Sequence, residues 1–351
     1  MRVAALAGGV GAGKLLRGLA RVVPPEDVTV VGNVADDLTL HGLHISPDLD
    51  SVLYWLAGEM DRERGWGRGG DTFRTLRELK RLGGAGWFTL GDLDLATHLY
   101  RTQRLDQGAP LSVVTDELRT AFGVTTRILP STDDRVMTWM LTEGVKVRGG
   151  PTPDAPPREV FPTPAAMPFQ HWWVAYRGEP VVEAIDFRGA EDAKPGPGVL
   201  EALAAADAVV ICPSNPVVSV GPILAVPGIA DAVRERRDRV VGISPIVGGA
   251  PVAGMADRLM PAWGLEVSAR GAAEAYRDLL AAWVIDERDA GLAGPIEDAL
   301  DVRVGVTDTI MTDDERAEAL ARAALELLGC ASSCFPSGAC QRSRRAPTSP
   351  S

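Results

Sequence analysis

A glycine-rich stretch near the N-terminus contains the residue types that bind phosphate groups. The sequence GGVGAGKLL follows the apolar run RVAALA and precedes a helical pattern. Glycines let backbone N–H groups approach phosphate oxygens, and a helix N-terminus behind them favours negative charge. We therefore expect Gly8, Gly9, Gly11 and Lys14 to contact a substrate phosphate. The simpler alternative is a tight strand-to-helix turn with no ligand.

The glycine stretch departs from the two common nucleotide-binding motifs. It fits the P-loop pattern G-x-x-x-x-G-K from Gly8 to Lys14, but Leu15 stands where that motif has a magnesium-binding Ser or Thr. As a dinucleotide fingerprint, its third glycine, Gly13, falls one position early. These departures disfavour a P-loop NTPase and a dinucleotide oxidoreductase.

The segment GNVADDLTLHGLHISPDLDS, residues 32–51, concentrates carboxylates after a second strand-like run. Its aspartates are Asp36, Asp37, Asp48 and Asp50. Carboxylate oxygens suit Mg²⁺, and an ion held there would neutralise diphosphate charge and assist attack at phosphorus. The alternative is that Asp48 and Asp50 cap the following helix. We expect His41 and His44, which alternate with apolar residues, to be structural.

Two later loops also follow strand-like runs. The stretch CPSNP places Ser214 and Asn215 between two prolines, which gives a stiff loop suited to a ribose or phosphate. By composition alone it is also an ordinary turn. The glycine-rich SPIVGG, which includes Gly248, is a candidate for binding a nucleotide base or the far phosphate. Cys212, in an apolar run, is expected to be a buried core thiol.

Strand-like runs alternate with helical patterns along most of the chain, which predicts an α/β fold. We expect a Rossmann-like, mainly parallel sheet with helices on both faces, and ligands beyond the carboxyl ends of its strands. Residues 51–135 are nearly all helical in pattern and predict a helical insertion or lid. One domain is expected over residues 1–329, with a Pro-rich surface excursion at 149–168 and a low-complexity, disordered tail at 330–351.

Composition and charge indicate a globular enzyme with small-molecule substrates. Of the 351 residues, 46% are hydrophobic and 24% charged, which is ordinary for a globular protein. The formal net charge of −11 argues against a nucleic-acid surface. No apolar run approaches the roughly 18 to 20 residues that span a bilayer, and the N-terminus lacks a signal-peptide pattern. We therefore expect a cytoplasmic protein with neither nucleic-acid nor membrane partners.

A series of sequence blocks, in order from residue 1 to about 329, resembles one known family. The blocks are GGVGAGKLL, HGLHISPDLDSVLYWLAG, GWGRGGDTF, LGDLDLATHLYRTQRL, PSTDDRV, FQHWWV, PSNPVVSVGPILAVPGI, SPIVGG and MTDDERA. They resemble the CofD family, the 2-phospho-L-lactate transferases of coenzyme F-420 biosynthesis. Its actinobacterial members, called FbiA, are phosphoenolpyruvate transferases. The resemblance implies a CofD-like Rossmann-like fold, dependence on Mg²⁺ and a homodimer.

The resemblance implies transfer of a phospho-acid group without a covalent intermediate. The donor would be lactyl- or enolpyruvyl-diphosphoguanosine, and the acceptor the deazaflavin Fo (7,8-didemethyl-8-hydroxy-5-deazariboflavin). The terminal ribityl hydroxyl of Fo attacks the phosphorus, GMP leaves, and F-420-0 or its dehydro form results. Lactyl, enolpyruvyl and glyceryl donors differ by one small group, which the sequence does not distinguish. The alternative is a YvcK-like protein of the same fold that binds a nucleotide diphosphate or nucleotide sugar without transfer.

The resemblance also assigns roles to individual residues. Asp37 and Asp50 are implied to be catalytic and to hold Mg²⁺, and Asp50 matches the family position that contacts the deazaflavin. Asp50 would therefore position the attacking hydroxyl or help to deprotonate it. Ser214, Asn215 and Gly248 fall where the guanylyl donor is expected.

One position departs from the family pattern. After LGD the family usually has Lys or Arg, at a position tied to Fo binding, whereas this chain has Leu93. Leu93 supplies no charge. Arg101, Arg104 or another base would then replace it, or the acceptor is held differently.

Overall fold

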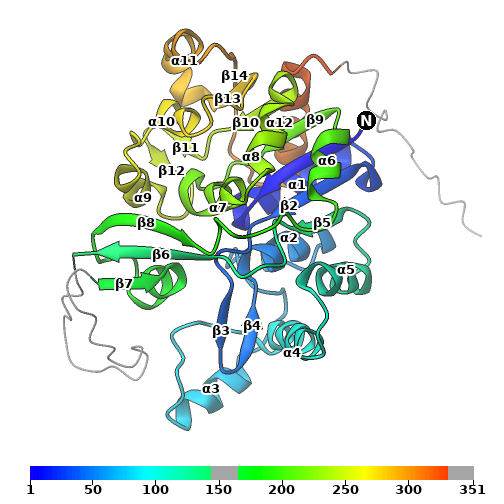
Figure 1. Cartoon of the computed structure of the whole chain (residues 1–351), viewed down its shortest axis with the longest axis vertical. Coiled ribbons are helices and arrows are strands. Elements are labelled where there is room, and N and C mark those ends of the chain that lie inside the picture. The colour runs from blue at the N-terminus through cyan, green and yellow to red at the C-terminus, as the bar shows by residue number, and fades with distance from the viewer. Residues whose placement is uncertain (144–164, 331–351) are drawn as a thin grey trace, which may run out of the picture.

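The computed structural model describes residues 1–143 and 165–330. At its centre lies a seven-stranded sheet in the order β14-β13-β10-β9-β1-β2-β5, in which every pairing is parallel (Figure 1). Its strands are β1 (Val3–Ala7), β2 (Val28–Gly32), β5 (Arg127–Pro130), β9 (Ala208–Ile211), β10 (Val240–Ile243), β13 (Ala282–Asp286) and β14 (Arg303–Thr307).

The strands are apolar on both sides because both faces of the sheet are covered. All five residues of β1 are buried. Ala4 and Leu6 pack into one hydrophobic cluster, whereas Val3, Ala5 and Ala7 pack into the other. This alternation follows from the two-residue period of a strand. The predicted α/β fold, a parallel sheet with helices on both faces, is confirmed.

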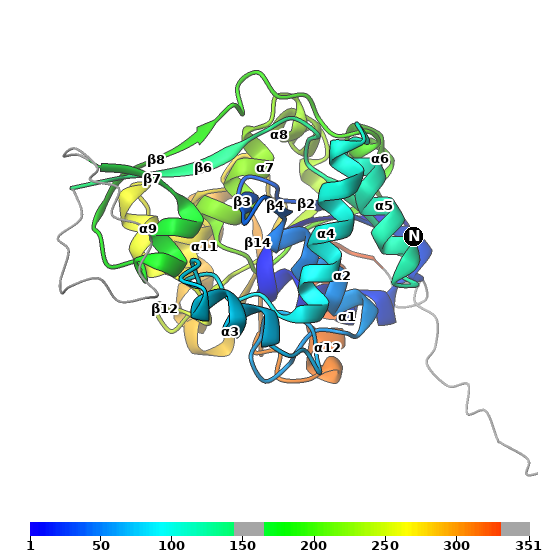
Figure 2. The ribbon, with the colours of Figure 1, turned by 90° about the horizontal axis from the view of Figure 1, so that it is seen from below.

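Two sets of helices cover the sheet (Figures 1 and 2). Those whose buried residues join the cluster of Val3 are α1 (Gly9–Val22), α2 (Pro47–Ala57), α5 (Leu111–Ala121) and α12 (Asp314–Leu327). Those that join the cluster of Leu6 are α6 (Val199–Ala205), α7 (Gly221–Ala225), α8 (Ile229–Arg234), α9 (Ala256–Ala262), α10 (Ala269–Glu274) and α11 (Ala293–Leu300). Across the described ranges, no helix has both the length and the apolar character to cross a membrane.

Smaller elements lie outside the central sheet. In Figure 1 a hairpin of β3 and β4 extends downwards from it, near α3 and α4, and a three-stranded antiparallel sheet of β6, β7 and β8 extends to the left. These elements are β3 (Leu38–Leu40), β4 (Leu43–Ile45), α3 (Arg74–Arg81), α4 (Asp92–Asp106), β6 (Met137–Thr142), β7 (Ala165–Pro168) and β8 (Val182–Arg188). The remaining short elements are β11 (Ile246–Val247), β12 (Ala250–Pro251), η1 (Pro25–Asp27), η2 (His171–Ala175), η3 (Pro216–Val220), η4 (Arg237–Arg239) and η5 (Glu287–Leu292).

The segment 51–135 is less uniformly helical than its pattern predicts. It contains most of α2 and all of α3, α4 and α5, but it also returns to the sheet as the edge strand β5. Ile128 of β5 is buried in the core. Four residues are too few to show a strand period, so the helical patterns around them dominate. Most of the predicted excursion at 149–168, and residues 331–351 of the predicted tail, lie outside the described residues.

The direction of the chain across the sheet reverses at β1. Strands β2 and β5 lie on one side of β1, and β9, β10, β13 and β14 lie on the other. Loops that leave the carboxyl ends of two strands at such a reversal diverge and form a crevice. The turn after β1, at Gly8, and the loop after β9, at Cys212, flank this crevice. Cys212 itself is a buried free thiol, as predicted.

The packing of α1 against α12 depends on a glycine. A Cβ on Gly18 would overlap the backbone carbonyl group of Ala317. We therefore expect Gly18→Ala to lower the free energy of unfolding by about 1–3 kcal/mol, because the helices must move apart. Gly294, in α11, has no such neighbour within 4 Å, so Gly294→Ala should be neutral or stabilising. Chemical denaturation measures both variants, and an unchanged Gly18→Ala would contradict the close packing.

Candidate active site

A cavity of about 760 Å³ lies beyond the carboxyl ends of the central strands. Its lining includes Gly8 after β1, Asp36 after β2, Ser214 after β9, Ser244 after β10 and Thr309 after β14. This is the place where parallel sheets bind ligands, and the volume is typical of a pocket for a small molecule. The cavity is therefore the candidate active site.

The glycine stretch forms the turn from β1 into α1. Gly9 has a φ of +71°, a conformation that favours glycine. A Cβ on Gly8 would lie 2.6 Å from Oδ2 of Asp48, and one on Gly11 would overlap the carbonyl oxygen of Pro213. These glycines line the cavity, and they also let the turn lie directly against α2 and the loop after β9. Packing alone therefore requires small residues here.

Two residues that follow the turn separate it from a P-loop. Leu15 is 1% exposed and belongs to the apolar core, so its side chain does not reach the cavity. Lys14 lines the cavity, with its Nζ 6.0 Å from the ring centroid of Trp55. The leucine that disfavours a P-loop therefore has a packing role, while the predicted lysine is at the site.

Three aspartates of the acidic segment have raised pKa values. Burial, followed by the charge of Asp48, holds the pKa of Asp36 well above its usual range, and burial also raises the pKa of Asp37. Burial raises the pKa of Asp48 to about 7. This occurs although Asn33 donates to its Oδ2 at 2.9 Å and a hydrogen bond from the Gly9 backbone lowers the value. Such crowded carboxyl groups favour a bound proton or a nearby cation.

Asp37 faces the β3–β4 hairpin and is not among the residues that line the cavity. Its Oδ2 lies 2.8 Å from His44 Nε2 and accepts a hydrogen bond from Ser46 Oγ at 2.7 Å. Its Oδ1, like Oδ1 of Asp36, is buried without a hydrogen-bond partner. Oxygens of this kind fit Mg²⁺. Within the described ranges, 1–143 and 165–330, no three His, Cys, Asp or Glu side chains are grouped so that they could hold a metal ion by themselves. Water or substrate oxygens would therefore have to complete the coordination of an ion bound here.

Asp50 lies in the first turn of α2, lines the cavity and is paired with Arg101 of α4. Arg101 Nη1 donates to Asp50 Oδ2 at 3.0 Å, and Nη2 donates to Oδ1. The two residues are only 4% and 2% exposed. Asp48 and Asp50 do not cap α2, because its first residue is preceded by Ser46 and no side chain caps it. The predicted site residue Asp50 is therefore at the cavity as part of a buried ion pair.

The side chain of Leu93 is 42% exposed. Arg101 does not replace the missing base, because it is buried in its contact with α2. Arg104 is engaged at the surface, where its Nη2 lies 2.8 Å from Oε1 of Glu117. Arg68 Nη1 donates to the carbonyl oxygen of Leu93 at 3.3 Å, but this guanidinium is also engaged, in an ion pair with Glu59.

The predicted donor-binding residues separate into two groups. Ser214 and Asn215 line the cavity, and their polar atoms also stabilise the fold. Ser214 Oγ donates to the carbonyl oxygen of Gly8 at 2.8 Å, and Asn215 Oδ1 accepts backbone hydrogen bonds at the start of η3. Gly248 lies in the β11–β12 turn, where its N–H donates to Asp289 Oδ2 at 2.9 Å, and it does not line the cavity. Its contact with a donor stays a prediction.

An aromatic wall forms part of the cavity, and sequence reasoning did not identify it. Trp66, Phe88, Phe169 and Trp173 line this wall. Trp66 is 41% exposed, and the guanidinium of Arg64 lies 5.3 Å from its ring centroid. Flat apolar side chains of this kind suit a planar ring system. Trp66 occurs in GWGRGGDTF, Phe88 in GWFTL, and Phe169 and Trp173 in FQHWWV. The sequence alone does not show that these distant stretches line one cavity.

On α4, sequence reasoning named Arg101 but missed two polar side chains, Asp94 and His98, that lie in a row with it. Asp94, His98 and Arg101 are spaced by four and three residues, so they share one helix face. Tyr54 OH donates to Asp94 Oδ1 at 2.7 Å and thereby joins α2 to this row. The spacing of these residues can be seen in the stretch LGDLDLATHLYRTQRL. The sequence does not show that their partners on α2 are Tyr54 and Asp50.

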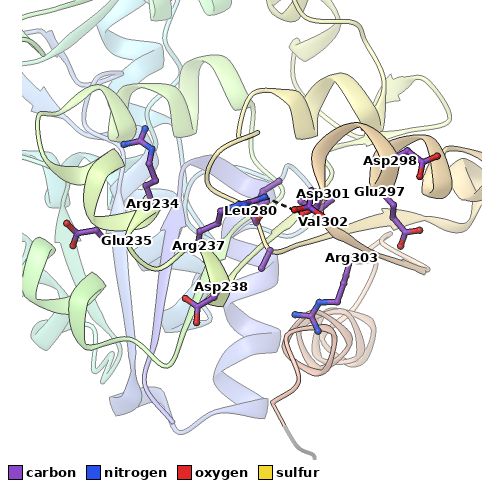
Figure 3. A pocket seen from close by; sticks show the side chains of 11 residues that line it. Arg234, Glu235, Arg237, Asp238, Leu280, Glu297, Asp298, Asp301, Val302 and Arg303 are labelled. Atoms are coloured by element: carbon purple, nitrogen blue, oxygen red, sulfur yellow. Dashed lines mark hydrogen bonds between the residues drawn. The ribbon is translucent and has the colours of Figure 1, made fainter.

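A second, more open hollow of about 720 Å³ lies at the opposite edge of the sheet, where β10, β13 and β14 begin (Figure 3). Its rim carries exposed charged side chains of both signs, including Arg234, Glu235 and Arg303. Arg237 donates there to the carbonyl oxygens of Leu280, at 3.0 Å, and of Asp301, at 3.3 Å. These contacts tie together the loops that precede the strands, so this hollow has a structural explanation.

Asp48 should make the folded protein less stable as pH rises towards neutrality. Its pKa is about 7 in the fold and near 3.8 in an unfolded chain, so the folded state binds the extra proton between these values. The contribution of this group to stability is fully present below about pH 4 and is lost as pH rises through 7. Asp48→Asn cannot ionise and should flatten the fall in Tm between about pH 4 and 7, measured with chelator.

The exposed Asp278→Asn serves as the control, and its Tm should follow the wild-type pH profile. Equal slopes for wild type and Asp48→Asn would contradict the assignment of the proton to Asp48.

The family model described as "2-phospho-L-lactate transferase CofD" matches residues 3–317. This range includes the central sheet and all of the elements that line the cavity.

Individual relatives agree with this match. The chain is 46% identical over 329 residues to the "Phosphoenolpyruvate transferase" of Streptomyces griseus, covering 93% of this chain and 98% of that protein. It is 42% identical over 315 residues to the "2-phospho-L-lactate transferase" of Methanosarcina mazei, covering 90% of this chain and 96% of that one.

A crystal structure of a UPF0052 family member from Bacillus halodurans shares the fold. Its TM-score is 0.57 at 19% identity, and the match covers 92% of this chain and 99% of that one. At this identity the likeness concerns the fold alone. The family model and the close relatives confirm the resemblance found in the sequence blocks: the chain belongs to the CofD family.

Proposed function

We propose that this protein transfers a phospho-acid group from a guanosine-diphospho-linked donor to the ribityl hydroxyl of Fo. The transferred group is 2-phospho-L-lactate or phosphoenolpyruvate, GMP is released, and F-420-0 or its dehydro form results. The names of the relatives support a phospho-acid transferase. The observation that carries the proposal is a single cavity whose lining combines the glycine turn, buried carboxylates and the aromatic wall.

Asp50 is the residue proposed to act on the acceptor hydroxyl. Its carboxylate lines the cavity, and Arg101 fixes its orientation. A hydroxyl hydrogen-bonded to a fixed carboxylate is oriented for attack and has an acceptor for its proton. The hydroxyl oxygen forms a bond to phosphorus as the bond between that phosphorus and the GMP oxygen breaks, and the proton passes to the Asp50 carboxylate.

Mg²⁺ is the proposed cofactor. Asp37 and Asp36 each have a buried carboxylate oxygen without a hydrogen-bond partner, and they would hold the ion together with water or substrate oxygens. Asp50 fits this role less well than expected, because both of its oxygens contact Arg101. When bound, the ion would neutralise charge on the diphosphate.

The donor is expected to lie along the glycine turn. The cavity lining here includes Gly8, Gly9, Gly11, Lys14 and Ser214. The aromatic wall is left for the deazaflavin ring. Following the family resemblance, we expect the enzyme to act as a homodimer in the cytoplasm.

A transfer assay tests the reaction and identifies the acid. We expect purified protein with Fo, Mg²⁺ and either the lactyl or the enolpyruvyl donor to release GMP and form the corresponding deazaflavin product, detected by mass spectrometry. Chelation with EDTA should stop the reaction, and added Mg²⁺ should restore it. Binding of the donor without product in any combination would contradict a transferase and support a nucleotide-diphosphate binding protein of the same fold.

Asp50→Asn tests the residue assigned to the acceptor. The amide keeps the size of the side chain but is a poor proton acceptor, so kcat should fall about 100-fold or more. Fo binding, measured by deazaflavin fluorescence, should change much less than kcat. The matched control is Asp278→Asn at the surface, which should keep wild-type kcat. Near wild-type turnover of Asp50→Asn would remove Asp50 from the chemistry.

A further inference from the structure

We propose that Arg101 is the positioning residue for Asp50, and that His98, Asp94 and Tyr54 hold its guanidinium in the orientation that directs Asp50 into the cavity. The inference rests on the proposed function of Asp50. Asp50, His98, Asp94 and Tyr54 all line the cavity, whereas Arg101 does not. Arg101 therefore acts through Asp50 and not by touching a ligand.

The contact between Arg101 and Asp50 fixes the plane of the carboxylate. Each of the two terminal nitrogens of the guanidinium bonds a different carboxylate oxygen. A contact of this two-point kind restricts rotation, which a single hydrogen bond does not. Both side chains are almost fully buried, so neither charge can turn away without losing its compensation. The ion pair also joins the first turn of α2 to α4.

His98 links Arg101 to Asp94 in one tautomer. Arg101 Nη1 lies 3.2 Å from His98 Nδ1. Because a guanidinium only donates, His98 Nδ1 must accept, which leaves the ring proton on Nε2. His98 Nε2 lies 3.4 Å from Asp94 Oδ1, which brings the imidazole next to that carboxylate without a hydrogen bond between them. The imidazole thereby limits where Arg101 Nη1 can lie.

Tyr54 closes the chain of contacts on α2, one turn from Asp50. Its hydroxyl donates to Asp94 Oδ1 at 2.7 Å. Burial, with the charges of Asp50 and Asp94, holds the pKa of Tyr54 well above its usual range, so the hydroxyl keeps its proton. Burial acts to raise the pKa of Asp94, but the nearby His98 imidazole and the hydrogen bond from Tyr54 hold it below its usual value. Arg101 therefore contacts the carboxylate of Asp50 directly and is linked through His98 to a second carboxylate, that of Asp94.

Stability alone does not explain this arrangement. A buried ion pair adds little free energy of folding compared with apolar residues of the same volume, because both charges lose their hydration. Arg101 Nε is, in addition, buried without a hydrogen-bond partner. What the chain of contacts provides is a carboxylate held in one orientation at the cavity wall. Positioning of this kind matters for transfer because a shift of about 1 Å can lower a rate about 100-fold.

The test is a double-mutant cycle on the transfer rate. We expect Arg101→Gln to lower kcat about 100-fold, and to lower it by less than about twofold further in an Asp50→Asn background, because the arginine acts through that carboxylate. Arg101→Lys keeps the charge but not the two-point contact, so its kcat should stay about tenfold or more below wild type, with KM for Fo nearly unchanged. Arg270→Gln, a helix arginine paired with Glu274, is the matched control and should keep wild-type kcat.

The outcomes separate this inference from the proposed function. If Asp50→Asn is inactive while Arg101→Gln transfers at the wild-type rate, positioning by Arg101 is overturned and the function of Asp50 stands. If the two losses multiply in the double variant, Arg101 acts independently of Asp50 and the inference is also wrong. If Arg101→Gln does not fold, judged by its thermal transition, Arg101→Lys decides: wild-type kcat overturns the inference. An active Asp50→Asn would instead remove Asp50 from the chemistry and overturn the inference with it, while the transferase activity itself would stand.

Discussion

The arrangement of the site depends on the burial of two carboxylates in the first turn of α2. Asp48 and Asp50 lie near the point where the strand order of the sheet reverses. The negative charges of the two carboxylates are compensated by different groups. Asp48 receives hydrogen bonds from neutral groups, the Asn33 amide and the Gly9 backbone, and burial still raises its pKa to about 7. Asp50 receives a full positive charge from Arg101. One carboxyl group is thus prone to take up a proton or a cation, while the other is held by a fixed partner.

This difference explains two features of the chain that otherwise have no connection. The turn after β1 needs glycine because a Cβ on Gly8 would displace Asp48. The helical insertion between β2 and β5 includes α4, whose buried face supplies Arg101 to Asp50. The insertion therefore does more than cover the cavity. It supplies the positive charge that pairs with Asp50 of α2, before the chain returns to the sheet at β5.

Sequence reasoning succeeded where the signal is local and failed where it depends on pairing. The pattern of apolar strands followed by glycine-rich or acidic loops predicted the sheet. It also predicted that Gly8, Asp36 and Asp50 lie at one edge of the sheet, where all three line the cavity. The four residues of β5 were too few to reveal a strand. The pairing of Asp50 with Arg101 joins residues 51 positions apart, and no spacing rule identifies such a partner.

The crowding of carboxylates also limits how a diphosphate can enter this cavity. The Gly9 backbone already bonds Asp48, so the glycine turn does not offer all of its N–H groups to a phosphate. An anion beside Asp36 and Asp48 would repel them unless a proton or a cation lies between. Lys14 supplies one positive charge at the cavity wall, and Arg101 is committed to Asp50. A diphosphate and a divalent cation are therefore expected to bind together, each reducing the cost of burying the other's charge.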